Sequence, residues 1–143
     1  MSEKVVSTHA GVDPGDIMLA QYSVPFTTAI ATFYDPNDPR VFSEHVMRDP
    51  RVRELASRIA LRWRPGMAKG WGGTMRVRLA NGEQLSGELN SFLGAPDMPL
   101  TEEGLKTKFE RLIQDEEPHL QATLFANLMR LEQVERISEL VLT

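Results

Sequence analysis

The spacing of apolar residues predicts a helix that begins after Ser23 and ends before Asp35. Ser23 suits a helix start because its hydroxyl accepts a hydrogen bond from a free backbone N–H. Pro25 suits the first turn, where no backbone N–H is needed. The apolar residues that follow have the i, i+3, i+4, i+7 spacing of one buried helical face: Phe26, Ala29, Ile30 and Phe33.

Shorter elements are predicted before and after this helix. Two neighbouring β-branched residues, Val5 and Val6, predict a strand over residues 4–8. Residues 16–21 predict one helical turn after a Gly- and Pro-rich connector, and residues 41–48 predict a further short helix.

Asp49 and Pro50 predict the start of the next helix, with Asp49 as the cap and Pro50 at the first helical position. The apolar face of this helix consists of Val52, Leu55, Ala56 and Ile59. From there apolar and polar residues alternate, which predicts a strand over residues 59–64 that buries Ile59, Leu61 and Trp63.

A β-hairpin is predicted over residues 74–89, because apolar and polar residues alternate on both sides of Asn81 and Gly82. A two-residue turn would set apolar residues across from polar ones on the same face. A three-residue loop over residues 80–82 instead pairs Val77 with Leu85 and Met75 with Gly87. We therefore predict a type I turn with Gly82 left-handed in a bulge.

Two helices are predicted towards the C-terminus. Thr101 caps the first, whose stripe of buried residues is predicted to be Leu105, Phe109, Leu112 and Ile113. The second opens at residues 116–118, and its apolar face is Leu120, Leu124, Leu128 and Leu131. The apolar residues Val134, Ile137, Leu140 and Val141 continue it towards the end. Together the elements predict an α+β fold: a small, mainly antiparallel sheet with helices packed on one face, plus the C-terminal helices.

Composition narrows the class of protein. The 143 residues are 41% hydrophobic and 25% charged, as in an ordinary globular protein, and the net charge of −4 does not suggest a nucleic-acid or membrane partner. The basic run between Arg51 and Arg64 is interpreted as a solvated face. There is no cysteine and no long apolar stretch, so we expect a cytoplasmic protein without thiolate chemistry.

The candidate chemistry is sparse. His9, His45 and His119 are not spaced as metal ligands, and the Glu pairs at 102–103 and 116–117 suit helix starts, so we predict no catalytic residue and no metal site. Tyr22 and Ser23 place polar groups beside a helix N-terminus, which can meet an anionic substrate. A cap with a packed tyrosine is the alternative interpretation.

Four stretches resemble sequence motifs of one protein family. Residues 20–31 are similar to a phrase "H/F-S-x-Q/P-Y/F" that runs into an Ala-rich helix, and residues 49–56 to "D-P-R-V-x-x-L-A". Residues 77–82 are similar to "V-x-L-x-D/N-G", and residues 94–109 to "G-x-P-x-x-P-L-S-x-E-E-L-x-x-K-F". In this order they resemble the C-terminal part of the MmgE/PrpD family, which includes 2-methylcitrate dehydratase, cis-aconitate decarboxylase and iminodisuccinate epimerase.

The resemblance implies the lid-type domain of a two-domain enzyme. Residues 1–115 would form the lid, and residues 116–143 would join an N-terminal helical domain that carries most catalytic residues. Such enzymes are usually homodimers. They act on small di- and tricarboxylates by proton transfer, without metal or organic cofactor. The chain would then be a lyase or isomerase portion that is inactive alone; the alternative is a non-catalytic binding or assembly module of the same fold.

The resemblance also implies the substrate-binding residues Tyr22, Ser23 and Phe26. The dehydratase and decarboxylase branches carry His at the position of Tyr22 and Tyr at the position of Phe26. Because a phenylalanine side chain cannot donate a proton or a hydrogen bond, Phe26 argues against those two reactions, though not against the family.

Overall fold

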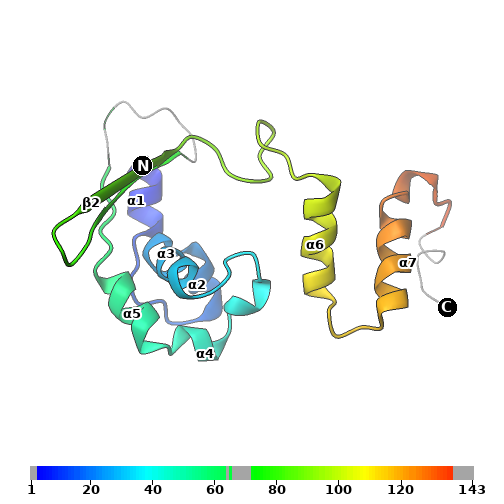
Figure 1. Ribbon diagram of the computed structural model, residues 1–143, viewed down its shortest axis with the longest axis horizontal. Helices are drawn as coiled ribbons and strands as arrows, with labels where there is room; N and C mark the ends of the chain where they lie inside the picture. Colours follow the sequence, from blue (N-terminus) through cyan, green and yellow to red (C-terminus); the bar gives the residue numbers. More distant parts are fainter. Residues whose placement is uncertain (1–2, 64, 66–71, 137–143) are drawn as a thin grey trace. The chain divides into compact units, whose positions relative to one another are not determined.

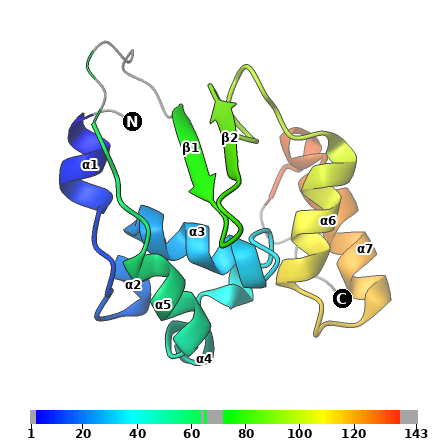
Figure 2. The same cartoon turned by 60° about the vertical axis from the view of Figure 1, so that its left-hand side comes forward.

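The computed structural model describes residues 3–63, 65 and 72–136. The chain divides into two compact units, Met1–Pro36 with Arg40–Pro99 and Asn37–Pro39 with Leu100–Thr143, and each is described by itself. Within the described residues there are seven α-helices and one antiparallel pair of strands (Figures 1 and 2). The predicted α+β class is confirmed.

The first unit contains five helices: α1 (Glu3–His9), α2 (Ile17–Tyr22), α3 (Val24–Phe33), α4 (Glu44–Met47) and α5 (Pro50–Ser57). The starts of α3 and α5 follow the predicted caps, and α2 has a side-chain cap that was not predicted. The side chain of Asp16 accepts a hydrogen bond from Leu19 N at 2.8 Å and begins α2. Ser23 and Asp49 begin α3 and α5 in the same way. A 3-10 turn, Pro39–Val41, lies between α3 and α4.

The core of this unit lies among the helices. α3 packs against α5, and their fully buried side chains include Phe26, Ile30 and Val52. Smaller residues from α2, α4 and the 3-10 turn complete the cluster: Ala20, Val41 and Val46. The predicted apolar faces of both helices are therefore confirmed, with one exception. Phe33, in the last turn of α3, is 41% exposed, and the Arg51 guanidinium lies 5.2 Å from its ring centroid.

Two predicted strands are wrong. Residues 4–8 are helical, and the hydroxyls of Ser7 and Thr8 both donate to the Lys4 carbonyl, one helical turn earlier. Val5 and Val6 are only half-buried, so β-branching alone did not decide the backbone here.

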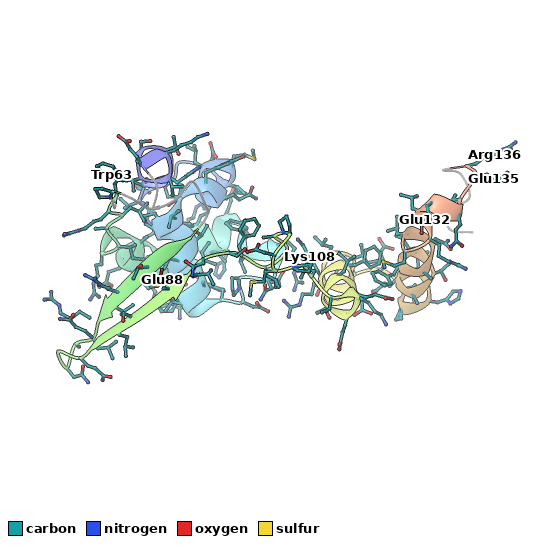
Figure 3. All side chains as sticks on the ribbon, turned by 90° about the horizontal axis from the view of Figure 1, so that it is seen from above. Trp63, Glu88, Lys108, Glu132, Glu135 and Arg136 are labelled. Carbon is teal, nitrogen blue, oxygen red and sulfur yellow. The ribbon has the colours of Figure 1, made fainter. Side chains whose placement is uncertain are left out.

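The second wrong strand is the one predicted over residues 59–64. Residues 59–63 have no regular structure, and residue 64 lies outside the described residues. Ile59 N bonds back to Ala56 O at 3.1 Å, and the Ile59 side chain packs on the helical core instead of on a sheet. Trp63, which was predicted to be buried, is 53% exposed at the surface of this unit (Figure 3).

The hairpin agrees with its predicted register. β1 (Gly73–Arg78) pairs with β2 (Gln84–Leu89), with Val77 opposite Leu85 and Met75 opposite Gly87. Gly82 N bonds to Leu79 O at 3.0 Å, and Gly82 has a φ of +87° in the predicted left-handed conformation. Within the strands only Gly73 and Val77 are half-buried, and every other residue is exposed, so the core does not lie beneath the sheet.

The second unit contains α6 (Glu102–Leu112), α7 (Pro118–Leu128) and a 3-10 turn, Leu131–Gln133. Thr101 caps α6 as predicted, accepting from Gly104 N at 3.0 Å. Phe109 and Phe125 join the two helices, with ring centroids 5.4 Å apart. None of the described residues 100–136 is buried, so the predicted buried stripe of α6 is wrong: Leu105 and Leu112 are exposed, and Phe109 and Ile113 are half-buried. Most of the predicted apolar tail, residues 137–141, lies outside the described residues.

Candidate functional site

The predicted substrate-binding residues lie at the junction of α2 and α3. Ser23 closes α2 and opens α3, and it is only 4% exposed. Its hydroxyl accepts a hydrogen bond from Phe26 N at 3.0 Å and donates one to the carbonyl of Gly11. Ser23 therefore joins three segments of backbone, and its donor proton is in use.

Tyr22 and Phe26 point to different environments. Phe26 is completely buried in the helical core, whereas Tyr22 is 58% exposed. Of the three predicted residues, Tyr22 thus offers its polar group most openly at the surface. That these residues contact a substrate stays a prediction.

His9 is a neighbour of this junction that the sequence reasoning did not place there. Its ring stacks on the Tyr22 ring, with centroids 5.8 Å apart and planes 12° from parallel. The ring is half-buried, and its Nδ1 atom is buried with no hydrogen-bond partner. Residues 4–8 were predicted to form a strand, and a strand there gave no reason to expect a contact between His9 and Tyr22.

A second polar group holds the start of α5. The Asp49 carboxylate is 8% exposed and accepts from Arg51 N at 2.9 Å and from Tyr34 Oη at 2.7 Å. The guanidinium of Arg51 binds the same carboxylate, with its NH2 nitrogen 2.6 Å from Oδ2. Asp49 therefore ties α5 to the residue that follows α3.

The same contacts shift the pKa values of the three groups. The hydrogen bond from the Arg51 guanidinium, then that from the Tyr34 hydroxyl, hold the pKa of Asp49 well below its ordinary value. The hydrogen bond to the Asp49 carboxylate raises the pKa of Tyr34 and also that of Arg51. This arrangement favours a permanently charged cap, which suits a structural role more than proton transfer.

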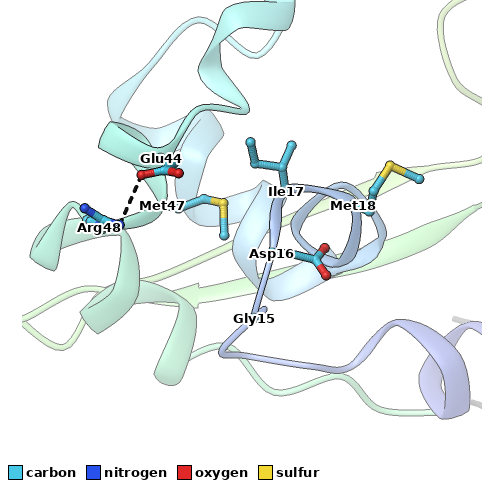
Figure 4. A pocket seen from close by; sticks show the side chains of 7 residues that line it. All are labelled: Gly15, Asp16, Ile17, Met18, Glu44, Met47 and Arg48. Atoms are coloured by element: carbon cyan, nitrogen blue, oxygen red, sulfur yellow. Dashed lines mark ion pairs between the residues drawn. The ribbon is translucent and has the colours of Figure 1, made fainter.

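The first unit also contains an open pocket of about 390 Å³ between α2 and α4 (Figure 4). Apolar side chains of Ile17, Met18 and Met47 line it, with an ion pair of 3.1 Å between Arg48 and Glu44 at one side. The side chain of Asp16 lies at the other side. The pocket carries two carboxylates and one guanidinium, so it would repel a negatively charged di- or tricarboxylate.

A comparison with known protein families identifies the family of this chain. Residues 3–130 match the family model described as the MmgE/PrpD C-terminal domain. The chain belongs to the MmgE/PrpD family. No curated protein matches it significantly. The predicted family is thereby confirmed, and the family is one of dehydratase- and decarboxylase-type enzymes.

The residues of the MmgE/PrpD sequence motifs have structural roles in this chain. In "D-P-R-V", Asp49 and Arg51 form the capping network, and Val52 is a fully buried core residue. In the phrase that contains Tyr22, Ser23 is the cap between two helices and Phe26 fills the core. Much of the resemblance therefore marks residues that hold this MmgE/PrpD domain together.

The described residues of this MmgE/PrpD domain contain neither a membrane-spanning helix nor a cluster of metal ligands. No helix there has the length and apolar character to cross a membrane. Nowhere in residues 3–63, 65 and 72–136 do three or more histidine or carboxylate side chains gather as a metal ion would require.

Proposed function

We propose that this chain is the C-terminal lid portion of an MmgE/PrpD-type lyase or isomerase that acts on small di- or tricarboxylates. The observation that carries the proposal is the match of residues 3–130 to the C-terminal domain of this family. In the proposed reaction a base removes a proton next to a substrate carboxylate, and hydrogen-bond donors hold the negative charge that develops.

The proposed contribution of this chain is to bind and orient the substrate. Tyr22 would donate its hydroxyl to a carboxylate at the N-terminal end of α3, where the helix dipole favours negative charge. Ser23 would act mainly by positioning, because its hydroxyl fixes the α2–α3 junction and the carbonyl of Gly11. Phe26 would support them from the core, because its completely buried ring packs beneath the α2–α3 junction.

The base is proposed to come from an N-terminal helical domain or subunit. In the part of the chain that the structure describes, His9 is the histidine that stacks on Tyr22, and the proposal does not make it the base. A lid of residues 1–115, with residues 116–143 joining the helical domain, belongs to the same proposal. The proposal also includes a homo-oligomeric enzyme and a cytoplasmic location.

Reconstitution tests this function. We expect the purified chain to leave methylcitrate, cis-aconitate and iminodisuccinate-type substrates unchanged, and to restore turnover when mixed with a matching N-terminal helical half. Tyr22→Phe should lower the restored turnover about tenfold, the size of one lost hydrogen bond. Thr32→Val, which alters an exposed hydroxyl on α3, should leave it unchanged and is the control.

Two outcomes would redirect the proposal. Robust turnover by the lone chain, abolished by one substitution within it, would show that it is a complete enzyme. Tight association with the helical half without any turnover would favour the second candidate, a non-catalytic binding or assembly module of the same fold.

A further inference from the structure

We propose that His9 works together with Tyr22 as a carboxylate-binding pair, and that this pair is the substrate-anchoring point of the lid. The inference rests on the proposed function and adds a residue and a ligand chemistry to its site. It starts from the near-parallel stacking of the two rings, whose centroids lie 5.8 Å apart.

The position of the hydrogen on His9 follows from burial. Nδ1 is buried and has no hydrogen-bond partner. A proton on this atom would be a buried donor without an acceptor, which folded proteins tolerate less well than a buried acceptor without a donor. The neutral ring is therefore favoured as the tautomer with its proton on Nε2, and the half-buried ring can then donate from that atom.

The pair offers two donors to one small anion. Tyr22 donates from its hydroxyl and His9 from Nε2, and the two rings lie in parallel planes. A small di- or tricarboxylate is long enough to bridge two groups on neighbouring rings. A carboxylate oxygen accepts from both kinds of donor, so one ligand can engage both residues.

The segment that carries His9 is held in place. The carbonyl of Gly11 accepts from the Ser23 hydroxyl, Pro14 is buried, and Asp13 pairs with Arg53 of α5 at 2.6 Å. The pairing with Arg53 also offsets the negative charge of Asp13 in this segment. Residues held in this way lose little freedom when a ligand binds, which favours affinity.

The alternative location in this unit is the pocket between α2 and α4. Asp16 and Glu44 line that pocket, and Arg48 is already paired with Glu44. A ligand with two or three negative charges would meet repulsion there. At the His9–Tyr22 pair both polar groups can donate a hydrogen bond to a carboxylate, which makes it the better site for such a ligand.

Side-chain NMR of the three histidines tests the inference on the chain alone. Citrate would be titrated against the ¹⁵N-labelled protein at constant ionic strength, with sodium chloride as the reference titration. We expect a saturable change in the Nε2 signal of His9. His45 and His119, both exposed and on other helices, are internal controls and should stay unchanged.

Variants make the test sharper. His9→Phe keeps an aromatic ring against Tyr22 but removes the donor, and should weaken citrate binding at least about tenfold, as for one lost hydrogen bond to a charged group. His45→Phe is the matched control and should bind as the parent does. Circular dichroism of both variants checks that the helices are retained.

Several results would overturn the inference: no response of His9, equal responses of all three histidines, or unchanged affinity in a folded His9→Phe variant. The test separates this inference from the proposed function. Restored turnover without a response of His9 would contradict the pair alone. A specific response of His9 without restored turnover would contradict the proposed reaction alone.

Discussion

Asp49 shows how one side chain can serve several contacts at once. Its carboxylate caps α5, binds the Arg51 guanidinium and accepts the Tyr34 hydroxyl, and it is largely buried while doing so. A buried carboxylate is stable only when such partners satisfy it. The sequence identified Asp49 as a cap, but the contribution of Tyr34 needed the tertiary structure.

Asp49→Asn should change how stability depends on pH. The pKa of Asp49 in the folded chain is lowered, so folding favours the ionised carboxylate. This stabilisation is present above the ordinary pKa of about 4 and is lost as the pH falls through the lower folded value. Asparagine still caps the helix but cannot be ionised, so the variant should lack this acid-dependent loss.

Urea unfolding at a series of pH values from neutral to strongly acidic measures this effect. Asp115→Asn, which changes an exposed carboxylate outside the network, is the control. Identical acid dependence in the parent and in Asp49→Asn would show that the network does not contribute to stability.

Phe26 offers a second test at the level of one residue. Phe26→Tyr adds a hydroxyl to a ring that is completely buried, and an unsatisfied buried hydroxyl costs about 1–3 kcal/mol. Phe33→Tyr adds the same group to the same helix at a ring that is 41% exposed, and should change stability by less than about 0.5 kcal/mol. Chemical denaturation compares the two; equal stabilities would mean that the core has room and a partner for the hydroxyl.

At the level of elements, local capping and cross-strand pairing determined most of the outcome. The starts of α3, α5 and α6 use the side-chain caps expected from sequence. The hairpin has the predicted three-residue loop, which sets Val77 across from Leu85; a two-residue loop would have set apolar residues across from polar ones. The two wrong strands lack both kinds of signal, since neither has a turn that fixes a partner strand.

Gly82→Ala tests the hairpin loop. Gly82 has a φ of +87°, where a side chain costs about 1–2 kcal/mol, and nothing lies within 4 Å to compensate. Hydrogen exchange of the Leu79 amide, which bonds to Glu83 O at 2.8 Å, should become about 5–30 times faster. Gly87→Ala in β2 is the control, because this glycine has open space and no positive φ. Equal effects would contradict the left-handed loop.

At the level of the whole chain, apolar surface exceeds what either unit covers. In the second unit Leu105, Leu112 and Leu131 are 42%, 57% and 51% exposed. In the first unit α2 exposes Met18 and Leu19, and the hairpin exposes Met75 and Leu89. Patches of this kind on a folded domain usually mark contact with another protein surface.

We expect the isolated chain to form dimers or larger assemblies through residues 120–131 and the apolar residues that follow. Sedimentation velocity at micromolar concentration measures this. Leu128→Glu, at a position that is 40% exposed on α7, should weaken association at least about tenfold, because it places a charge in an apolar contact. Gln133→Glu is the matched control for added charge. A clean monomer in the parent chain would contradict the expectation.

The sequence by itself determined the elements whose signals are local. The sequence predicted the caps at Ser23, Asp49 and Thr101, the hairpin register around Gly82 and the motifs shared with the MmgE/PrpD family. Each of these depends on residues within a few positions of one another. Tertiary structure alone decided which of these residues share an environment. It placed Phe26 in the core and Phe33 at its edge, and it brought His9 to Tyr22. Such contacts depend on how helices pack, and periodicity along the chain carries no information about that packing partner.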